Sequence, residues 1–319
     1  MKELVSIIIP TFNRANLISY TLDSVLNQDY TSWECLVVDD GSTDKTQEVV
    51  LGYIQKDSRI KLLHRPNDWI KGANSCRNYG LENCNGFFVN WLDSDDVLDK
   101  NHLKIHIEKH TEFNVQATVS NAKVFFSQPN DSNQYWSLNY KTEDLITDMT
   151  SSVVSWQTAA VLWKKESLYS KPFKEVLSSS QEWTFHLERV INHLSYHVFF
   201  DTTVYIRRHE ERIGKDFSPK KFKSTVLSRY YIYKILNQKN RLTKNRELEL
   251  LHRIFQSIKK TIQNKYDSLL WFQIRCLITL IFISTFKIRI LKLLIVALPV
   301  YRFLGKGEKY FSLKQRNDE

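Results

Sequence analysis

Residues 87–96 read FFVNWLDSDD, an apolar run that ends in three carboxylates within four positions. Residues 87–92 predict a buried β-strand, because the run is short, apolar and rich in aromatic side chains. The acids that follow are Asp93, Asp95 and Asp96. Side chains alternate along a strand, so Asp93 and Asp95 are expected on one side and Ser94 on the other. Like charges this close repel unless a cation, a proton or open water relieves them, so the crowding needs a physical reason.

The chain before this strand alternates between strand and helix patterns. Short apolar runs that predict strands cover residues 5–9, 35–38 and 60–63. Patterns that predict helices lie between the strands, at residues 14–28, 42–54 and 73–83. This alternation indicates an α/β fold with a mostly parallel sheet that is buried on both faces.

Polar clusters follow three of the predicted strands, at residues 11–14, 39–42 and 93–96. Ligands of parallel sheets bind beyond the carboxyl ends of the strands, so the three clusters are expected to converge on one crevice. The alternative is that these residues only make turns and helix caps, with Ser42 or Thr43 as a cap.

The acidic cluster has the composition of a hard-oxygen metal site. Two acids on one side with a third beside them suit Mg²⁺ or Mn²⁺, whose coordination is usually completed by water and substrate phosphates. A calcium EF-hand is excluded, because the loop lacks its glycine and the twelfth position from Asp93 is Lys104. The chain has no GxxxxGK[ST] motif and no GxGxxG after a strand, which excludes P-loop and dinucleotide sites.

The composition indicates a cytoplasmic protein. The four cysteines form no CxxC pair and are expected as reduced thiols in the core. The N-terminal stretch MKELVSIIIPTFNR has too short an apolar segment for a signal peptide.

The net charge of +10 is unevenly distributed. Residues 215–319 contain 23 Lys and Arg against 7 Asp and Glu, whereas residues 1–214 contain 22 against 28. Beyond Pro219 the pattern predicts helices to the end. We therefore expect two regions, residues 1–214 and a basic, amphipathic helical region at residues 215–319.

Four stretches together resemble family 2 of the glycosyltransferases, which have the GT-A fold. They are IIIPTFNR (7–14), VVDDGSTD (37–44), KGANSCRNYGL (71–81) and NWLDSDD (90–96), in the order and spacing of that family. The resemblance is strong over residues 4–100 and weak to about residue 210. It implies a Rossmann-like, mostly parallel sheet flanked by helices, with a C-terminal helical appendage. Residues 1–100 would be the nucleotide-binding half and residues 101–214 the acceptor half.

The resemblance also implies a donor site. Residues that would bind the nucleotide-sugar are Pro10, Thr11, Phe12, Arg14, Asp39 or Asp40, Arg77 and Asp93. Asp40 or its neighbour Asp39 would accept a hydrogen bond from the base, and Arg77 would lie near the base or the diphosphate. Asp93 and Asp95 match the family's DxD pair, with Asp93 on the donor and Asp95 on Mn²⁺ or Mg²⁺. Asp96 would support these metal ligands.

An inverting transferase needs a base for the acceptor hydroxyl, and Glu182 matches the family's acid in a similar Gln-Asp/Glu-Trp context. The alternative is a helix-start carboxylate that the helix dipole stabilises. Trp183 is expected either to stack on the acceptor sugar or to lie in the core. His209, with Arg207 and Arg208, would contact the diphosphate or the metal; the alternative is a solvated charged loop.

The C-terminal region has apolar stretches that are interrupted by basic residues. Its longest charge-free stretch, residues 276–286, is eleven residues and too short to span a bilayer. We expect helices that lie on the cytoplasmic face of the inner membrane, with a helical appendage packed on the core or on a second copy in a homodimer as the alternative. Nucleic acid is not expected as a partner, because the basic residues alternate with aliphatic runs.

The leading hypothesis is a bacterial glycosyltransferase that adds one sugar, since the QxxRW signature of processive synthases is absent after Gln181. It would be metal-dependent and inverting, and would move a sugar from a UDP-sugar to a glycan or lipid-linked glycan in cell-surface polysaccharide or lipopolysaccharide synthesis. The alternative is a non-catalytic sugar-nucleotide-binding or scaffold protein of such an assembly. A nucleotidyltransferase is a third hypothesis, but its Gly-rich N-terminal loop is absent.

Overall fold

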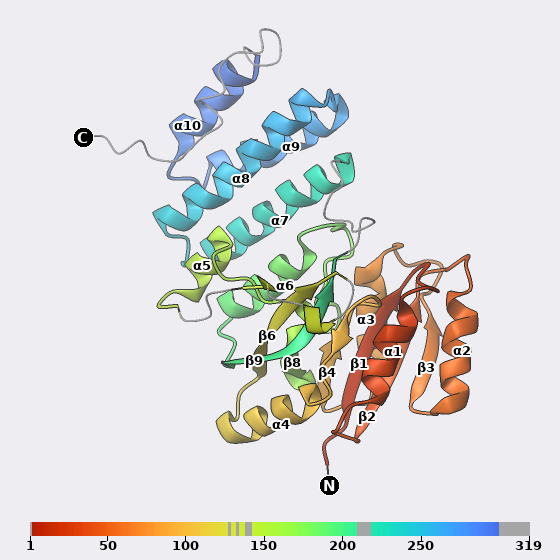
Figure 1. The fold of residues 1–319 in the computed structure, drawn as a ribbon. Helices are drawn as coiled ribbons and strands as arrows, with labels where there is room; N and C mark the ends of the chain where they lie inside the picture. The colour runs from red at the N-terminus through yellow and green to blue at the C-terminus, as the bar shows by residue number, and fades with distance from the viewer. Residues whose placement is uncertain (1, 127–128, 132–133, 138–141, 209–217, 300–319) are drawn as a thin grey trace. The chain divides into compact units, whose positions relative to one another are not determined.

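The computed structural model describes residues 2–126, 129–131, 134–137, 142–208 and 218–299. The chain divides into two compact units (Figure 1). The first comprises residues 1–141, 154–176 and 193–212, and the second comprises residues 142–153, 177–192 and 213–319. The functional division at residue 214 stays a prediction.

The first unit contains one mixed sheet. Its strands are β1 (Val5–Thr11), β2 (Trp33–Asp39), β3 (Ile60–His64), β4 (Phe88–Trp91), β5 (Val97–Leu98), β6 (Ala117–Phe125), β7 (Gln134–Tyr135), β8 (Val161–Lys164) and β9 (Tyr196–Arg207). The strand order is β3-β2-β1-β4-β8-β6-β9-β5, and β7 pairs with β6. The four strands β3, β2, β1 and β4 are parallel, as the sequence predicted. β1 is buried along its whole length and pairs with β2 and β4, so it is the centre of this half.

Four helices connect the strands of this unit: α1 (Ile18–Leu26), α2 (Thr46–Lys56), α3 (Ala73–Asn83) and α4 (His102–Phe113). Helix α3 lies close to the sheet because Gly80 has no side chain. A Cβ at Gly80 would lie 2.3 Å from Cγ2 of Ile8. The close approach fixes the helix that carries Arg77.

Two predicted helix starts are too early. Helix α1 begins at Ile18, because residues 14–17 form a turn in which the Arg14 amide donates to Thr46 Oγ1 (2.7 Å). Helix α2 begins at Thr46, and neither Ser42 nor Thr43 is its cap. Ser42 instead donates its backbone N–H to the Asp39 carboxylate (3.0 Å), so it belongs to the turn after β2.

The second unit consists of helices. They are α5 (Leu145–Ser151), α6 (Gln181–Ile191), α7 (Pro219–Gln238), α8 (Lys244–Gln263), α9 (Asp267–Ile281) and α10 (Lys287–Lys292), followed by a π-helical segment at Leu293–Ala297. Among the described helices, none is long and apolar enough to cross a bilayer.

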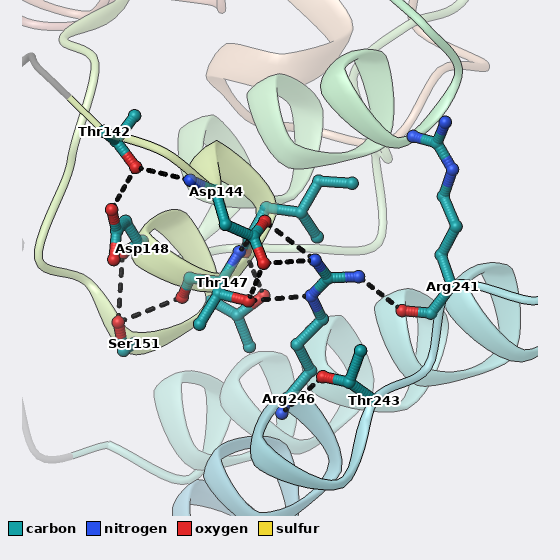
Figure 2. Close-up of polar contacts among 10 residues, drawn as sticks. Thr142, Asp144, Thr147, Asp148, Ser151, Arg241, Thr243 and Arg246 are labelled. Atoms are coloured by element: carbon teal, nitrogen blue, oxygen red, sulfur yellow. Dashed lines mark hydrogen bonds and ion pairs between the residues drawn. The ribbon is translucent and has the colours of Figure 1, made fainter.

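A polar network joins α5 to the start of α8 (Figure 2). Asp144 caps α5 by accepting from the Thr147 amide, and its carboxylate also accepts from Arg246 Nη2 at 2.7 and 2.6 Å. Arg246 Nε donates to Thr147 Oγ1 (2.9 Å), and its Nη1 donates to the Arg241 carbonyl (2.6 Å). The network therefore ties residues 144–147 to the C-terminal helices.

Candidate active site

The loops that follow β1 and β2 are held together by hydrogen bonds. The Asn13 amide donates to Ser42 Oγ (3.0 Å), and the Thr43 amide donates to Asn13 Oδ1 (2.8 Å). The loop after β4 lies at the same edge of the sheet, because β2, β1 and β4 are parallel neighbours. The first unit thus brings the three predicted polar clusters to one edge.

The acidic cluster lies in a turn. Strand β4 ends at Trp91, and the Asp96 amide donates to the Asp93 carbonyl (3.2 Å). One carboxylate oxygen from each of Asp93, Asp95 and Asp96 lies within 4.8 Å of the others. Strand alternation therefore does not govern these residues, and the turn gathers all three acids.

Each end of the cluster has a cationic or amide neighbour. Arg77 Nη2 donates to Asp93 Oδ1 (2.6 Å), and the Arg77 side chain is only 3% exposed. Asp96 is buried, and its carboxylate accepts from the Arg207 amide (3.0 Å) and from Gln157 Nε2 (3.3 Å). Arg207 Nε donates to the Asp95 carbonyl (3.1 Å). These bonds hold the turn in shape and reduce the repulsion between the acids.

The donor set fits a hard divalent cation. Three carboxylates with one oxygen each inside a 4.8 Å span can face a single ion, and Asp93 and Asp95 are only half-buried. Mg²⁺ and Mn²⁺ accept such oxygens and keep further positions for water or phosphate.

The two acids after β2 have different partners. Asp39 accepts from the Ser42 amide and from Gln47 Nε2 (2.8 Å), so its carboxylate stabilises the local turn. Asp40 pairs with Arg65, whose Nε lies 2.5 Å from Asp40 Oδ1. The Asp40 carboxylate therefore lies beside a cationic side chain, that of Arg65, at this edge of the sheet.

Arg65 is a candidate site residue that the sequence analysis missed. It directly follows β3 and donates its backbone N–H to the Asp39 carbonyl (3.0 Å). Ligands of parallel sheets bind beyond the carboxyl ends of the strands, and this holds for β3 as well as for β1, β2 and β4. The position of Arg65 directly after the apolar run of β3 could therefore have indicated it.

The predicted residues at the end of β1 lie as follows. Pro10 is buried in the strand opposite Val38. Thr11 is 3% exposed, and its Oγ1 has no hydrogen-bond partner among the described residues. Phe12 is exposed, with Lys71 Nζ 4.0 Å from its ring centroid. Arg14 bonds to the Asn13 carbonyl through Nη1 (3.2 Å). A buried hydroxyl beside an exposed ring is a suitable lining for a polar, planar ligand.

Glu182 lies in the first turn of α6, in the second unit. The preceding Ser180 has a left-handed backbone (φ 58°), and its Oγ accepts from Arg229 Nη1 (2.8 Å). The Arg229 guanidinium lies 4.1 Å from the Trp183 ring centroid, and Trp183 Nε1 donates to the Met149 carbonyl (2.7 Å). Residues on both sides of Glu182 are therefore fixed by Arg229. His209 lies outside the described residues.

Comparison with known proteins identifies the family. The model of Glycosyl transferase family 2 matches residues 6–167, just over half of the 319-residue chain. The chain belongs to glycosyl transferase family 2. The matched residues include the acids after β2 and β4, so the resemblance seen in the sequence is confirmed.

A curated relative of this family 2 chain is the Escherichia coli UDP-Glc:alpha-D-GlcNAc-diphosphoundecaprenol beta-1,3-glucosyltransferase WfgD. The two are 42% identical over 121 residues, which is 38% of this chain and 46% of the E. coli protein. The match thus spans about half the length of that relative.

Two solved structures resemble the family 2 chain over most of its length. S. aureus TarS in complex with UDP-GlcNAc has a TM-score of 0.59 and 19% identity, over 81% of each chain. The mannosyltransferase PcManGT from Pyrobaculum calidifontis, in complex with GDP-Man and Mn2+, has a TM-score of 0.52 and 16% identity, over 96% of this chain and 82% of its own. The likeness confirms the predicted GT-A type fold.

Proposed function

We propose that this chain transfers one sugar from a nucleotide-diphosphate sugar, most simply a UDP-sugar, to a glycan or lipid-linked glycan, with Mn²⁺ or Mg²⁺ and with inversion. The observation that carries the proposal is the acidic turn after β4, which gathers Asp93, Asp95 and Asp96 beside the loops after β1 and β2 in a family 2 chain.

The nucleotide would bind at the edge formed by β1, β2 and β3. The Thr11 hydroxyl offers a hydrogen bond, Phe12 offers an aromatic face, and Pro10 and Arg14 complete the lining. Asp40 would accept from an N–H of the base, with Arg65 holding the carboxylate in place (2.5 Å). Asp39 would act indirectly by shaping the turn, since the Ser42 amide and the Gln47 amide bind its oxygens.

The donor's sugar and diphosphate would lie over the acidic turn. Asp93 would accept from a sugar or ribose hydroxyl, while Arg77 fixes its orientation (2.6 Å). Asp95 would hold the divalent cation, with Asp93 beside it and Asp96 supporting the turn. A bound Mg²⁺ or Mn²⁺ supplies Lewis-acid stabilisation of the charge that develops on the leaving diphosphate. His209 and Arg208 are proposed to add positive charge there.

Glu182 would take the proton of the acceptor hydroxyl. As the acceptor oxygen bonds to the anomeric carbon, the bond from that carbon to the diphosphate oxygen breaks, and the configuration inverts. The immobilised neighbours Ser180 and Trp183 would keep this carboxylate in a fixed position.

The names of the relatives support the choice of substrates. WfgD is named for a UDP-Glc donor and a diphosphoundecaprenol acceptor, and TarS was solved with UDP-GlcNAc. PcManGT was solved with GDP-Man and Mn2+. We therefore favour a UDP-sugar, a lipid-linked acceptor and a place at the cytoplasmic face of a membrane, in the synthesis of a surface polysaccharide.

The test is turnover of the purified chain with Mn²⁺ and a panel of UDP-, GDP- and dTDP-sugars, with an undecaprenyl-diphosphate-linked sugar as acceptor. Glu182→Gln should abolish transfer but leave donor binding intact. Glu48→Gln is the matched control, because Glu48 also lies in the first turn of a helix but is exposed. Full transfer by Glu182→Gln would refute the assigned base.

A further inference from the structure

We propose that α9 and α10 form a docking surface for the anionic phospholipid of a bilayer. Three large apolar side chains of α9 are exposed, namely Trp271 (65%), Ile278 (44%) and Phe282 (78%), the last at the end of the helix. Their spacing of seven and four residues places them in one row along the helix, and Arg275 lies in the same row.

The opposite face of α9 is buried. Leu270, Leu277 and Leu280 are at most 5% exposed, and α9 contacts α7 and α8 within the second unit. The helix is therefore packed in a defined rotation, and its exposed row is a fixed feature of the surface. Isolated exposed apolar residues are ordinary, but an aligned row of large ones marks an interaction surface.

Helix α10 has an exposed apolar row of its own. Ile288 (70%), Leu291 (40%) and Ile295 (70%) are exposed at three- and four-residue spacing, whereas Ile290 and Leu293 are buried. Like α9, α10 and the π-helical segment after it thus bury one side and expose an apolar row.

The turn between the two helices is held by a buried acid. Glu247 is 1% exposed and accepts from Tyr233 Oη (2.5 Å), Ser284 Oγ (2.6 Å) and the Thr285 amide (2.9 Å). Because Ser284 and Thr285 connect α9 to α10, Glu247 fixes where the first row ends and the second begins.

The charge of the surface selects the partner. Residues 268–299 contain Arg275, Lys287, Arg289 and Lys292 and no Asp or Glu. Apolar side chains that insert at the level of the headgroups, with basic side chains beside them, are typical of helices that lie on anionic lipid. A symmetric dimer through the same face would bring the basic residues of two copies together, which disfavours a second copy as the partner.

This inference deepens the proposed function, because a lipid-linked acceptor lies in a bilayer, but it does not depend on catalysis. Lipid binding is measured without donor or acceptor, so the lipid-binding result can be interpreted even if the catalytic proposal fails. Conversely, a chain that transfers sugar but does not bind lipid vesicles would refute only the docking surface.

The experiment is co-sedimentation of the full chain with vesicles of phosphatidylcholine alone or mixed with phosphatidylglycerol, at low and high salt. We expect binding only to the anionic vesicles, weakened by salt. Arg289→Gln with Lys292→Gln should weaken it by roughly 25-fold, since each basic residue near the surface contributes about fivefold. Phe282→Ser with Ile288→Ser should weaken it at least tenfold by removing inserted apolar area.

The matched control is Leu51→Ser with Phe200→Ser, which removes exposed apolar side chains of the first unit, 51% and 57% exposed, and should leave lipid binding unchanged. Thermal unfolding of every variant verifies that the fold is retained. Equal binding by the wild type and the α9–α10 variants, or no binding to anionic vesicles, would overturn the proposal. So would a wild-type dimer that these variants convert to a monomer, because the surface would then belong to a second copy.

Discussion

Asp95 and Asp96 are neighbours in sequence, but they differ in their surroundings. Asp96 is 2% exposed and its carboxylate accepts from the Arg207 amide and from Gln157. Asp95 is half-buried and shares the acidic cluster. Asp96 therefore stabilises the folded turn, whereas Asp95 is the more accessible of the two to a ligand.

Substitution by asparagine should distinguish the stabilising role of Asp96 from the ligand-binding role of Asp95. Asp96→Asn turns one acceptor oxygen into a donor opposite an amide, so the free energy of unfolding should fall by about 1–3 kcal/mol. Asp95→Asn removes one of three crowded charges, so the free energy of unfolding should be unchanged or slightly higher. Metal-dependent turnover should fall at least about 100-fold. Urea unfolding and turnover of both variants provide the check. Equal loss of stability in both would contradict the distinction.

At the scale of elements, the sequence predicted the strands better than the helix starts. β1, β2 and β3 were predictable because each is a short apolar run, and β1 and β2 end in a polar cluster. The start of α1 was not, because the Arg14 amide is bound by Thr46, a residue far along the chain. Helix α4 was missed because three of its four buried residues are histidines, which a hydrophobic pattern does not register.

The candidate site was predictable to a similar degree. Motifs gave Asp93, Asp95 and Asp40 together with their place at the sheet edge, since strand ends converge in a parallel sheet. They did not give the pairing of Asp40 with Arg65 or of Arg77 with Asp93, because such contacts depend on how loops fold in three dimensions. The role of Glu182 stays a prediction.

Helix α3 should be sensitive to any side chain at Gly80. Gly80→Ala puts a Cβ 2.3 Å from Ile8, which must push α3 away from β1 and should cost about 1–3 kcal/mol. Gly52→Ala is the control on α2, where a Cβ meets nothing within 4 Å, and it should stabilise the chain by about 0.5–1 kcal/mol. Urea unfolding compares the two. A Gly80→Ala variant as stable as the wild type would show that the approach of α3 is not tight.

Helix α6 should depend on Arg229. Arg229→Lys keeps the charge but loses the planar group that lies over Trp183 and bonds to Ser180, so the first turn of α6 should loosen. We expect transfer to slow about tenfold with donor affinity unchanged, because the donor site belongs to the other unit. Arg253→Lys, at an exposed pair with Glu249 on α8, is the control. A loss of donor affinity equal to the loss of turnover would contradict this assignment.

The stability of the whole molecule should depend on three buried histidines of α4. Burial lowers the pKa of His102 to about 3 and of His110 to about 4, and it lowers the pKa of His106 well below its usual range. His102 Nδ1 lies 2.8 Å from Thr203 Oγ1, and His106 Nδ1 lies 2.7 Å from Thr118 Oγ1, so both rings have neutral partners. All three stay neutral in the folded chain near pH 7.

The unfolded chain binds more protons than the folded one once the pH falls below the ordinary histidine pKa of 6.5. The contribution of these histidines to the free energy of unfolding should therefore be complete above that pH and should decrease towards pH 4. The free energy of unfolding should fall with a limiting slope of about 1.4 kcal/mol per pH unit for each histidine. His106→Gln should reduce the slope below pH 6.5 by up to one such increment, in urea unfolding measured between about pH 7.5 and about pH 5. The exposed His193→Gln is the control, and an unchanged slope in His106→Gln would argue against burial as the cause.

The proposed transfer requires a nucleotide that binds together with a divalent cation at the acidic turn. Calorimetric titration of UDP, GDP and dTDP into the full chain, with Mn²⁺ or with EDTA, measures this directly. We expect one nucleotide to bind at least about tenfold more tightly with Mn²⁺, and Asp95→Asn to lose this gain but retain the weaker metal-free binding. Equal affinity with Mn²⁺ and with EDTA in the wild type, or no binding of any of the three nucleotides, would contradict it.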